Sequence, residues 1–172
     1  KNFAKLNDLN LNQLVRALGN SSENLVTQNA QNLLAQPQCF KSSLYTAFGS
    51  SLENSFPEKS AIDATIALYK KATECDSEES AYRAAYRLGL LYVWQDQCPA
   101  AISHFENVQK SPDVSFLHSR SRYWQLYCKD PNSSTSEIAS QRLKKLQDFP
   151  LSFHTLLYYG DKSDEVFEIA KA

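Results

Sequence analysis

The sequence predicts an all-α protein built as a stack of antiparallel helix pairs, and three observations lead to this prediction. Apolar residues recur at intervals of three and four along most of the chain, which is the period of an amphipathic helix. Among 172 residues there are only 4 glycines and 6 prolines, whereas strand-and-turn architectures usually contain more of both. The helical segments also pair up about every 34 to 38 residues, a period that is typical of an α-solenoid.

The N-terminal half is expected to contain four helical segments, which glycine and proline separate from one another. Their apolar faces lie at residues 11–18, 25–34, 44–48 and 62–69. Gly19 and Gly49 each follow such a face, where a helix C-terminus is expected, and Pro57 opens the fourth helix.

The C-terminal half continues the pattern. A helix is expected from Glu78 to about Gln95, and Pro99 falls in the first turn of the next helix, where its missing N–H costs nothing. Proline and turn-forming residues then mark breaks at 111–113 and 130–134. The helical segments expected after the first break are centred on 123–127, 135–147 and 150–160, and a last one begins near residue 163.

One segment, residues 82–115, carries a set of small and large apolar residues at fixed spacing. Gly89 and Ala101 would let two helices approach closely, while Tyr92 and Phe105 would fill the groove beside them. The complete set is Tyr82, Leu88, Gly89, Tyr92, Ala101, Phe105 and Val108. This pattern resembles a tetratricopeptide repeat, although Pro112 lies one residue early and Ala85 replaces a large residue.

Two weaker repeats flank this one, at about 41–75 and 116–149. In the first of them, the second helix is identified by Ala64, Leu68 and Ala72. The resemblance therefore implies a tetratricopeptide-like α-solenoid, a superhelical stack that occupies residues 1–172 as a single domain. The last helix is still in progress at the final residue, so the chain is interpreted as a fragment of a longer protein.

A second resemblance concerns the C-terminal third. It contains Arg120-Ser-Arg-Tyr-Trp124, later Phe149-Pro-Leu-Ser-Phe-His154, and then Leu156-Leu-Tyr-Tyr-Gly160. These elements are similar to the non-catalytic superhelical region of soluble lytic transglycosylases. That resemblance implies a periplasmic protein that acts on peptidoglycan, whose catalytic domain would follow this region.

Four cysteines mark the compartment. Cys39 and Cys75 each follow the second helix of a pair, and Cys98 and Cys128 each lie near the end of a first helix. Helix ends of the same kind share one edge of a solenoid, so disulfides 39–75 and 98–128 are predicted out of three possible connectivities. Such pairs would imply a periplasmic or otherwise exported protein. The alternative is four unpaired thiols that pack as small hydrophobic groups.

A ligand groove is expected on the concave surface that the first helices of each pair would form. Counting from Tyr82 places three side chains there, Arg83, Tyr86 and Trp94. The following repeat would add Arg120, Trp124 and Tyr127. Aromatic rings and guanidinium groups suit sugar or peptide recognition, but aromatics at helical spacing also form cores.

Composition narrows the possible partners. The formal net charge is −1, and the 22% charged residues carry both signs, so no nucleic-acid partner is expected. No apolar run approaches the roughly 18 residues of a membrane span. The three histidines lie on different predicted helices and no phosphate-binding glycine loop is present, so no catalytic residue, metal or cofactor is assigned.

Two functions remain open from the sequence. The first is the scaffold and binding region of a lytic transglycosylase-like, peptidoglycan-processing protein, in which this chain would contribute no catalysis. The second is a stand-alone adaptor of the bacterial cell envelope that holds a protein or peptide in the concave groove.

Overall fold

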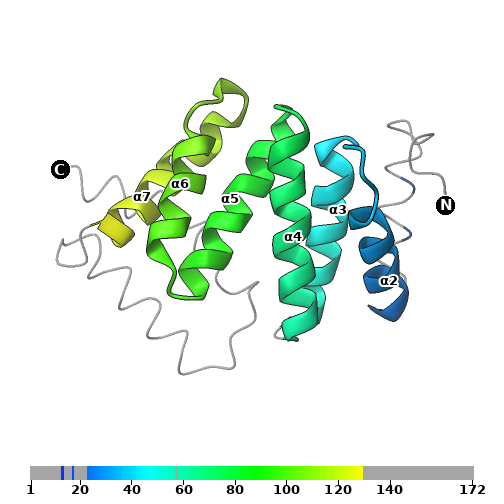
Figure 1. Cartoon of the computed structure of the whole chain (residues 1–172). Coiled ribbons are helices and arrows are strands. Elements are labelled where there is room, and N and C mark those ends of the chain that lie inside the picture. Colours follow the sequence, from blue (N-terminus) through cyan, green and yellow to red (C-terminus); the bar gives the residue numbers. More distant parts are fainter. Residues whose placement is uncertain (1–12, 14–16, 18–22, 57, 130–172) are drawn as a thin grey trace. The chain divides into compact units, whose positions relative to one another are not determined.

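A computed structural model describes residues 13, 17, 23–56 and 58–129 of the chain (Figure 1). Within these ranges every regular element is helical and no strand occurs, which confirms the all-α prediction for this part of the chain. The elements are α2 (Glu23–Leu34), α3 (Ser42–Leu52), the 3₁₀ turn η2 (Glu53–Ser55), α4 (Lys59–Cys75), α5 (Glu79–Trp94), α6 (Cys98–Val108), the 3₁₀ turn η3 (Pro112–Leu117) and α7 (His118–Lys129).

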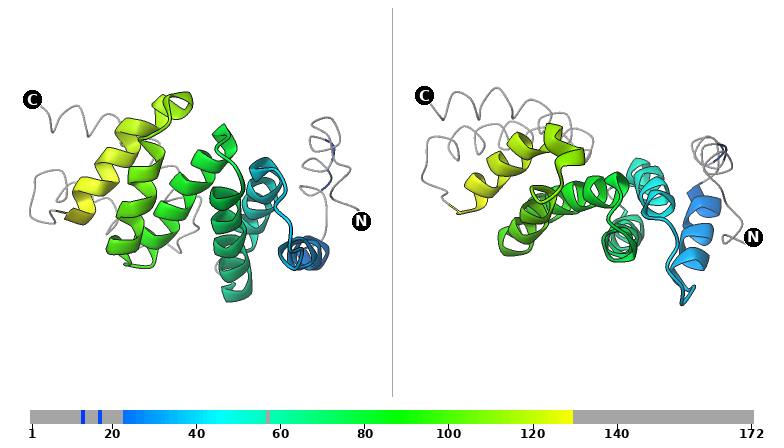
Figure 2. Two further views of the ribbon diagram at one scale, coloured as in Figure 1. Left: turned by 45° about the horizontal axis from the view of Figure 1, so that its top comes forward. Right: turned by 90° about the horizontal axis from the view of Figure 1, so that it is seen from above.

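The chain divides into two compact units, Lys1–Ala84 and Ala85–Ala172. In unit 1, α3 and α4 run antiparallel because the short η2 turn reverses the chain between them, and α2 packs against both (Figure 2). The buried positions of α2 and α4 recur at helical spacing, so each helix turns one apolar face to this core. The core side chains are Val26, Ala30, Leu33, Leu44, Tyr45, Phe48, Leu52, Ala61, Leu68, Tyr69 and Ala72.

Two polar contacts fix the start of α3. The Asp76 carboxylate, at the end of α4, accepts the Ser42 N–H with Oδ2 at 2.8 Å and the Glu78 N–H with Oδ1 at 3.0 Å. It therefore pairs one of the N–H groups that a helix start leaves without a partner inside the helix. The buried Tyr45 hydroxyl accepts the Phe40 N–H at 3.3 Å; burial raises the pKa of Tyr45, and this hydrogen bond opposes the rise.

Unit 2 contains α5 from Ala85 onward, α6, η3 and α7. Helix α5 ends in a reversed turn in which Asp96 has a φ of 58° and the Gln97 N–H donates to the Tyr92 carbonyl at 2.8 Å. This is the six-residue hydrogen bond that closes many helices at a left-handed residue. Pro99 lies in the first turn of α6, as expected. Helix α7 packs against both α6 and η3.

The structure corrects one local prediction in unit 1. Helix α3 does not end at Gly49 but continues through it to Leu52, and Gly49 is buried inside the helix. The error arose because glycine in a sequence is a common sign of a helix end, whereas here it is a sign of close helix packing. The expected helix around Ala64, Leu68 and Ala72 is present as α4; Leu68 and Ala72 are buried in it, and Ala64 is half-buried.

The predicted helices before residue 23 and after residue 129, and the weak repeat at 116–149 beyond Lys129, lie outside the described residues. The same holds for the elements at 149–154 and 156–160 that carry much of the lytic transglycosylase resemblance.

Candidate functional site

Each unit contains one disulfide that ties together the open end of a helix hairpin. Cys39, just before α3, is bonded to Cys75, the last residue of α4, with the Cα atoms 5.3 Å apart. Cys98, the first residue of α6, is bonded to Cys128 near the end of α7, with a Cα separation of 5.1 Å. These are the two pairs expected from the sequence, and no free cysteine remains.

A glycine on one helix lies against an aromatic ring on the next helix in both units. A Cβ atom added to Gly49 of α3 would lie 2.5 Å from Tyr69 Cε1 on α4, and one added to Gly89 of α5 would lie 2.6 Å from Phe105 Cε1 on α6. Real side chains do not approach so closely, so only glycine allows these two helix pairs to pack as they do. The residues beside Gly89 follow expectation, since Leu88, Ala101 and Val108 are all fully buried.

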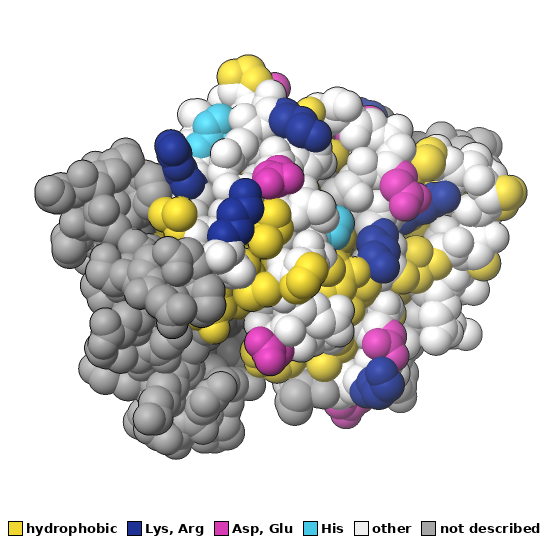
Figure 3. Space-filling view, turned by 60° about the vertical axis from the view of Figure 1, so that its left-hand side comes forward, with side chains coloured by type: hydrophobic (Ala, Val, Ile, Leu, Met, Phe, Trp, Pro, Cys, Tyr) yellow, Lys and Arg dark blue, Asp and Glu magenta, His cyan; other side chains and the backbone are white. Residues whose placement is uncertain are grey.

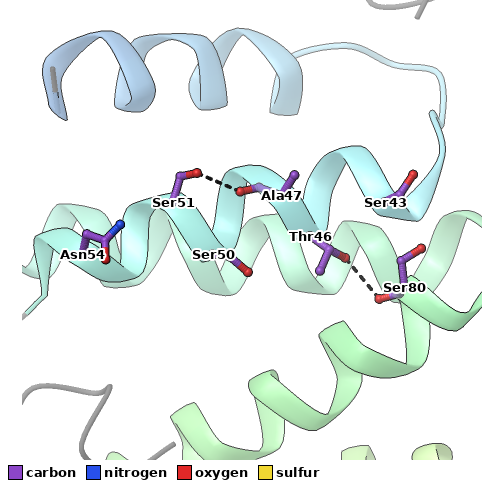
Figure 4. A pocket seen from close by; sticks show the side chains of 7 residues that line it. All are labelled: Ser43, Thr46, Ala47, Ser50, Ser51, Asn54 and Ser80. Atoms are coloured by element: carbon purple, nitrogen blue, oxygen red, sulfur yellow. Dashed lines mark hydrogen bonds between the residues drawn. The ribbon is translucent and has the colours of Figure 1, made fainter. Parts of the chain in front are cut away.

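Helix α3 carries an open pocket of about 420 Å³ on one of its faces (Figure 4). The described residues that line it all have small, uncharged side chains, and most of these side chains carry a hydroxyl group. The lining residues are Ser43, Thr46, Ala47, Ser50, Ser51, Asn54 and, from the start of α5, Ser80. The pocket lies entirely within unit 1.

This pocket was not predicted from the sequence, although a signal for it was present. If Gly49 is aligned with Gly89, the groove positions expected on α5 move back by the same 40 residues (89 − 49 = 40). Arg83, Tyr86 and Trp94 then correspond to Ser43, Thr46 and Asn54, all of which line the pocket. The signal was lost because Gly49 was taken as the end of a helix, which left α3 without a register.

A buried acid lies behind the pocket. Glu53 in η2 is only 2% exposed, and its Oε1 accepts a hydrogen bond from the hydroxyl of Tyr69, which is also fully buried. The Ser50 hydroxyl, on the pocket wall, lies 3.3 Å from the same Tyr69 oxygen. A buried carboxylate needs such partners, because removal of a charge from water is costly. The chain Glu53–Tyr69–Ser50 therefore links the core of unit 1 to the pocket.

The three groove residues predicted on α5 have different surroundings. Arg83 is exposed, and its guanidinium forms an ion pair with Glu79 one turn earlier, at 2.6 Å. Trp94, at the end of α5, is partly exposed. Tyr86 is only 6% exposed, and its ring lies 5.9 Å from the ring of Phe105. Tyr86 is thus a packing residue in this structure, whereas Arg83 and Trp94 reach solvent.

The three groove residues predicted on α7 also differ in their exposure to solvent. Trp124 is 2% exposed and makes edge-to-face contacts with the rings of Tyr123, at 4.9 Å, and Tyr127, at 5.8 Å. Arg120 and Tyr127 are partly exposed. The Trp124 ring therefore contributes to the core of unit 2. Aromatic residues at helical spacing can line a groove or pack in a core, and here the core role holds.

The described histidines occupy packing positions. The ring of His104 stacks on that of Tyr92 at 5.4 Å, and His118 Nε2 lies 2.8 Å from the Ser111 carbonyl oxygen. His154 lies outside the described residues. Among the residues that the structure describes, no group of three or more His, Cys, Asp or Glu side chains is placed to hold a metal ion.

Charge is dispersed on the face of the molecule that Figure 3 presents. Lys and Arg side chains alternate there with Asp and Glu, and neither sign forms a continuous area. None of the helices within 23–56 and 58–129 combines the length and the apolar character that a bilayer crossing demands.

Comparison of the chain with protein-family models, with curated proteins and with solved structures gives no match.

Proposed function

We propose that this chain is a non-catalytic helical module that holds a ligand on behalf of an exported protein, in an oxidising compartment such as the periplasm. The observation that carries the proposal is the pairing of all four cysteines in two disulfides. Structural disulfides persist in exported proteins, whereas the reducing systems of the cytoplasm keep most thiols free.

The helix packing supports the binding role. The glycine-to-ring contact occurs in the α3/α4 pair and again in the α5/α6 pair, as expected for tetratricopeptide-like repeats. Proteins built from such repeats bind ligands on surfaces that successive helices form together. Further support is that three residues lining the pocket, Ser43, Thr46 and Asn54, align with the positions on α5 to which the repeat resemblance assigns ligand contact.

The more specific proposal is that the parent protein is a lytic transglycosylase-like enzyme of peptidoglycan processing. In it, this superhelical, tetratricopeptide-like region would position peptidoglycan and leave catalysis to another domain. The support is the sequence resemblance at Arg120–Trp124 and in the segment 149–160.

One observation favours a second candidate, an envelope adaptor that binds a protein or peptide. The Arg83 guanidinium is exposed on α5, and Trp94 on the same helix is partly exposed. Arginine pairs well with peptide carboxylates, and an indole ring suits an apolar side chain.

The compartment is tested by the redox state of the cysteines. The chain is isolated from its native cell under acid-quenched, non-reducing conditions, denatured, and treated with an alkylating reagent of known mass. Mass spectrometry is expected to show no alkylation before reduction and four additions after it. Four additions without reduction would end the export argument.

The ligand is tested by sedimentation with purified peptidoglycan sacculi. The chain is expected to pellet with sacculi, and the Arg83→Ala and Trp94→Ala variants report whether α5 takes part. Arg122→Ala, which removes another exposed arginine, is the matched control. A chain that stays in the supernatant contradicts the peptidoglycan proposal. Capture of a defined envelope protein that Arg83→Ala weakens and Arg122→Ala does not would support the adaptor instead.

A further inference from the structure

The hydroxyl groups that line the α3 pocket have most of their protons committed inside the protein. The single proton of Thr46 Oγ1 is shared between two acceptors, the Ser42 carbonyl at 2.9 Å and the Ser80 carbonyl at 3.1 Å. Ser51 Oγ donates to the Ala47 carbonyl at 3.0 Å. A hydroxyl has one proton and two lone pairs, so these two side chains can only accept a hydrogen bond from anything that enters the pocket.

The third hydroxyl is that of Ser50, and the direction of its hydrogen bond with Tyr69 follows from the buried acid Glu53. The single proton of the Tyr69 hydroxyl is donated to Glu53, and Glu53 is fixed in the core. The contact between Ser50 and Tyr69 must then run from Ser50 Oγ to the Tyr69 oxygen. Ser50 is thereby also left with lone pairs only, and the buried carboxylate maintains this direction.

The pocket wall thus presents acceptors at three neighbouring positions of one helix. None of the described residues that line the pocket is ionisable, so these residues offer no counter-charge to an ion. At Thr46, Ser50 and Ser51 an anionic ligand would meet lone pairs, with Glu53 behind them, whereas a ligand with several O–H groups could donate to all three. The Ser43 hydroxyl and the Asn54 amide of the same lining also carry donor groups, which suit the oxygen atoms of such a ligand. The methyl groups of Ala47 and Thr46 can pack against the C–H groups of such a ligand.

We propose that this pocket binds a segment of a neutral polyol, such as a sugar ring, which donates hydroxyl protons to Thr46, Ser50 and Ser51. Its volume of about 420 Å³ falls in the usual range of small-molecule sites, roughly 300 to 1,000 Å³. The inference rests on the proposed function, since it names the chemistry of the ligand that the helical module holds and where it binds.

The direction of the hydrogen bonds is tested with a matched pair of ligands. The ¹⁵N-labelled chain is titrated with cellotriose and, separately, with per-O-methylated cellotriose, which keeps the ring oxygens but has lost every donor. Cellotriose is expected to shift amide resonances of residues 43–54 and Ser80. The methylated compound is expected to bind at least about tenfold more weakly, a loss that corresponds to about 1.4 kcal/mol. Equal responses to the two compounds would overturn the proposal.

The location is tested with two alanine variants in unit 1. Ala47→Phe fills the pocket, while Ala67→Phe adds the same ring at a half-buried alanine of α4 that does not line it. Cellotriose shifts are expected to disappear in the first variant and to persist in the second, with the ¹⁵N spectrum reporting that each is folded. Persistent binding by a folded Ala47→Phe variant would remove the pocket from the binding site.

Failure of this inference can be told apart from failure of the proposed function. Shifts that appear at Arg83 and Trp94 but not on α3 would keep a sugar-binding module and reject the pocket. Pocket shifts in a chain that does not pellet with sacculi would keep the pocket and reject peptidoglycan as the ligand. A response on α3 to N-acetyl-dialanine, which carries a carboxylate, that exceeds the response to cellotriose would contradict the acceptor wall directly.

Discussion

The helix pairs α3/α4 and α5/α6 share one packing device and differ in the face beside it. In both, a glycine of the first helix admits an aromatic ring of the second, Tyr69 in unit 1 and Phe105 in unit 2. Forty positions apart, however, α3 has Thr46 and Ser50 where α5 has Tyr86 and Leu90, which are both buried. These two positions therefore face a hollow in unit 1 and belong to the core in unit 2.

This difference teaches that the glycine–ring contact specifies how the two helices of a pair pack, while the residues on the remaining face decide whether that face is filled or hollow. Large apolar side chains at these positions are drawn into the core because their burial is favourable. Small hydroxyls have little area to bury and satisfy themselves on nearby carbonyls, as Thr46 and Ser51 do. The space that they leave is the pocket.

The disulfides differ between the two units as well. In unit 1 the disulfide and the glycine contact reinforce the same pair, α3/α4. In unit 2 the glycine contact joins α5 to α6, and the disulfide joins α6 to α7. Unit 1 therefore concentrates both constraints on one helix pair, whereas unit 2 spreads them over three helices.

The largest effect is expected from removal of the disulfides. The Cys39→Ala/Cys75→Ala and Cys98→Ala/Cys128→Ala variants each open a loop, of sequence separation 36 and 30 respectively. The loop-entropy relation predicts a loss of about 4 kcal/mol of unfolding free energy in each. Urea unfolding followed by circular dichroism measures it. If removal of one of the two disulfides lowers the free energy of unfolding by less than 1 kcal/mol, that disulfide does not stabilise its helix pair as the other does, and the two units differ in this respect.

The next largest loss of stability is expected when the partner of the buried Glu53 is removed. The described residues of unit 2 include no buried acidic side chain of this kind. Tyr69→Phe keeps the ring but removes the hydroxyl that donates to Glu53, and should cost about 3 kcal/mol in unfolding free energy. Tyr45→Phe is the matched control, because that buried hydroxyl accepts only a neutral backbone N–H, and about 1 kcal/mol is expected there. Equal losses would show that Glu53 does not depend on Tyr69.

Substitution of the two glycines compares the helix contacts directly. Gly49→Ala and Gly89→Ala each place a methyl group inside an aromatic ring contact, and about 1 to 3 kcal/mol of destabilisation is expected after the gain in helix propensity. Gly49→Ala should lower the free energy of unfolding by more than Gly89→Ala does, because the Tyr69 hydroxyl is hydrogen-bonded to Glu53 and its ring cannot move aside easily. The Phe105 ring beside Gly89 has no hydroxyl and is not held in this way.

A rescue experiment checks the cause of the glycine effect. Phe105→Leu in the Gly89→Ala background should recover part of the lost stability, because the smaller side chain makes room for the methyl group. If the double variant is as unstable as the sum of the two single variants, the ring contact is not what requires Gly89.

The smallest effect is expected at Arg83. Its ion pair with Glu79 is exposed and lies within one helix, so Arg83→Ala should lower the unfolding free energy by no more than about 0.5 kcal/mol. Thermal unfolding at low and high salt measures this, and the difference between variant and parent should shrink as salt rises. A larger loss would mean that Arg83 has a structural role that its exposure does not indicate.

Several elements could be predicted from the sequence because their physical causes are local. The period of apolar residues gave the helices of the described part, and the spacing around Gly89, Ala101 and Phe105 predicted the close packing of α5 on α6. The cysteine pairing also followed, because the ends of neighbouring antiparallel helices lie close together. Each of these predictions needed only the position of a residue along a regular helix.

The pocket and the fate of the predicted groove residues could not be predicted in this way. Whether Tyr86 or Trp124 faces a ligand or the core depends on which neighbour covers it, and that is a property of the packed structure. Nor does any local pattern pair Glu53 with Tyr69 or direct the proton of Ser50. The sequence by itself determined the helices and the spacing at which they can touch, because both follow from a 3.6-residue period. Only the tertiary structure decided which faces are buried and which way the hydroxyls point, because burial and hydrogen bonding depend on residues far apart in the chain.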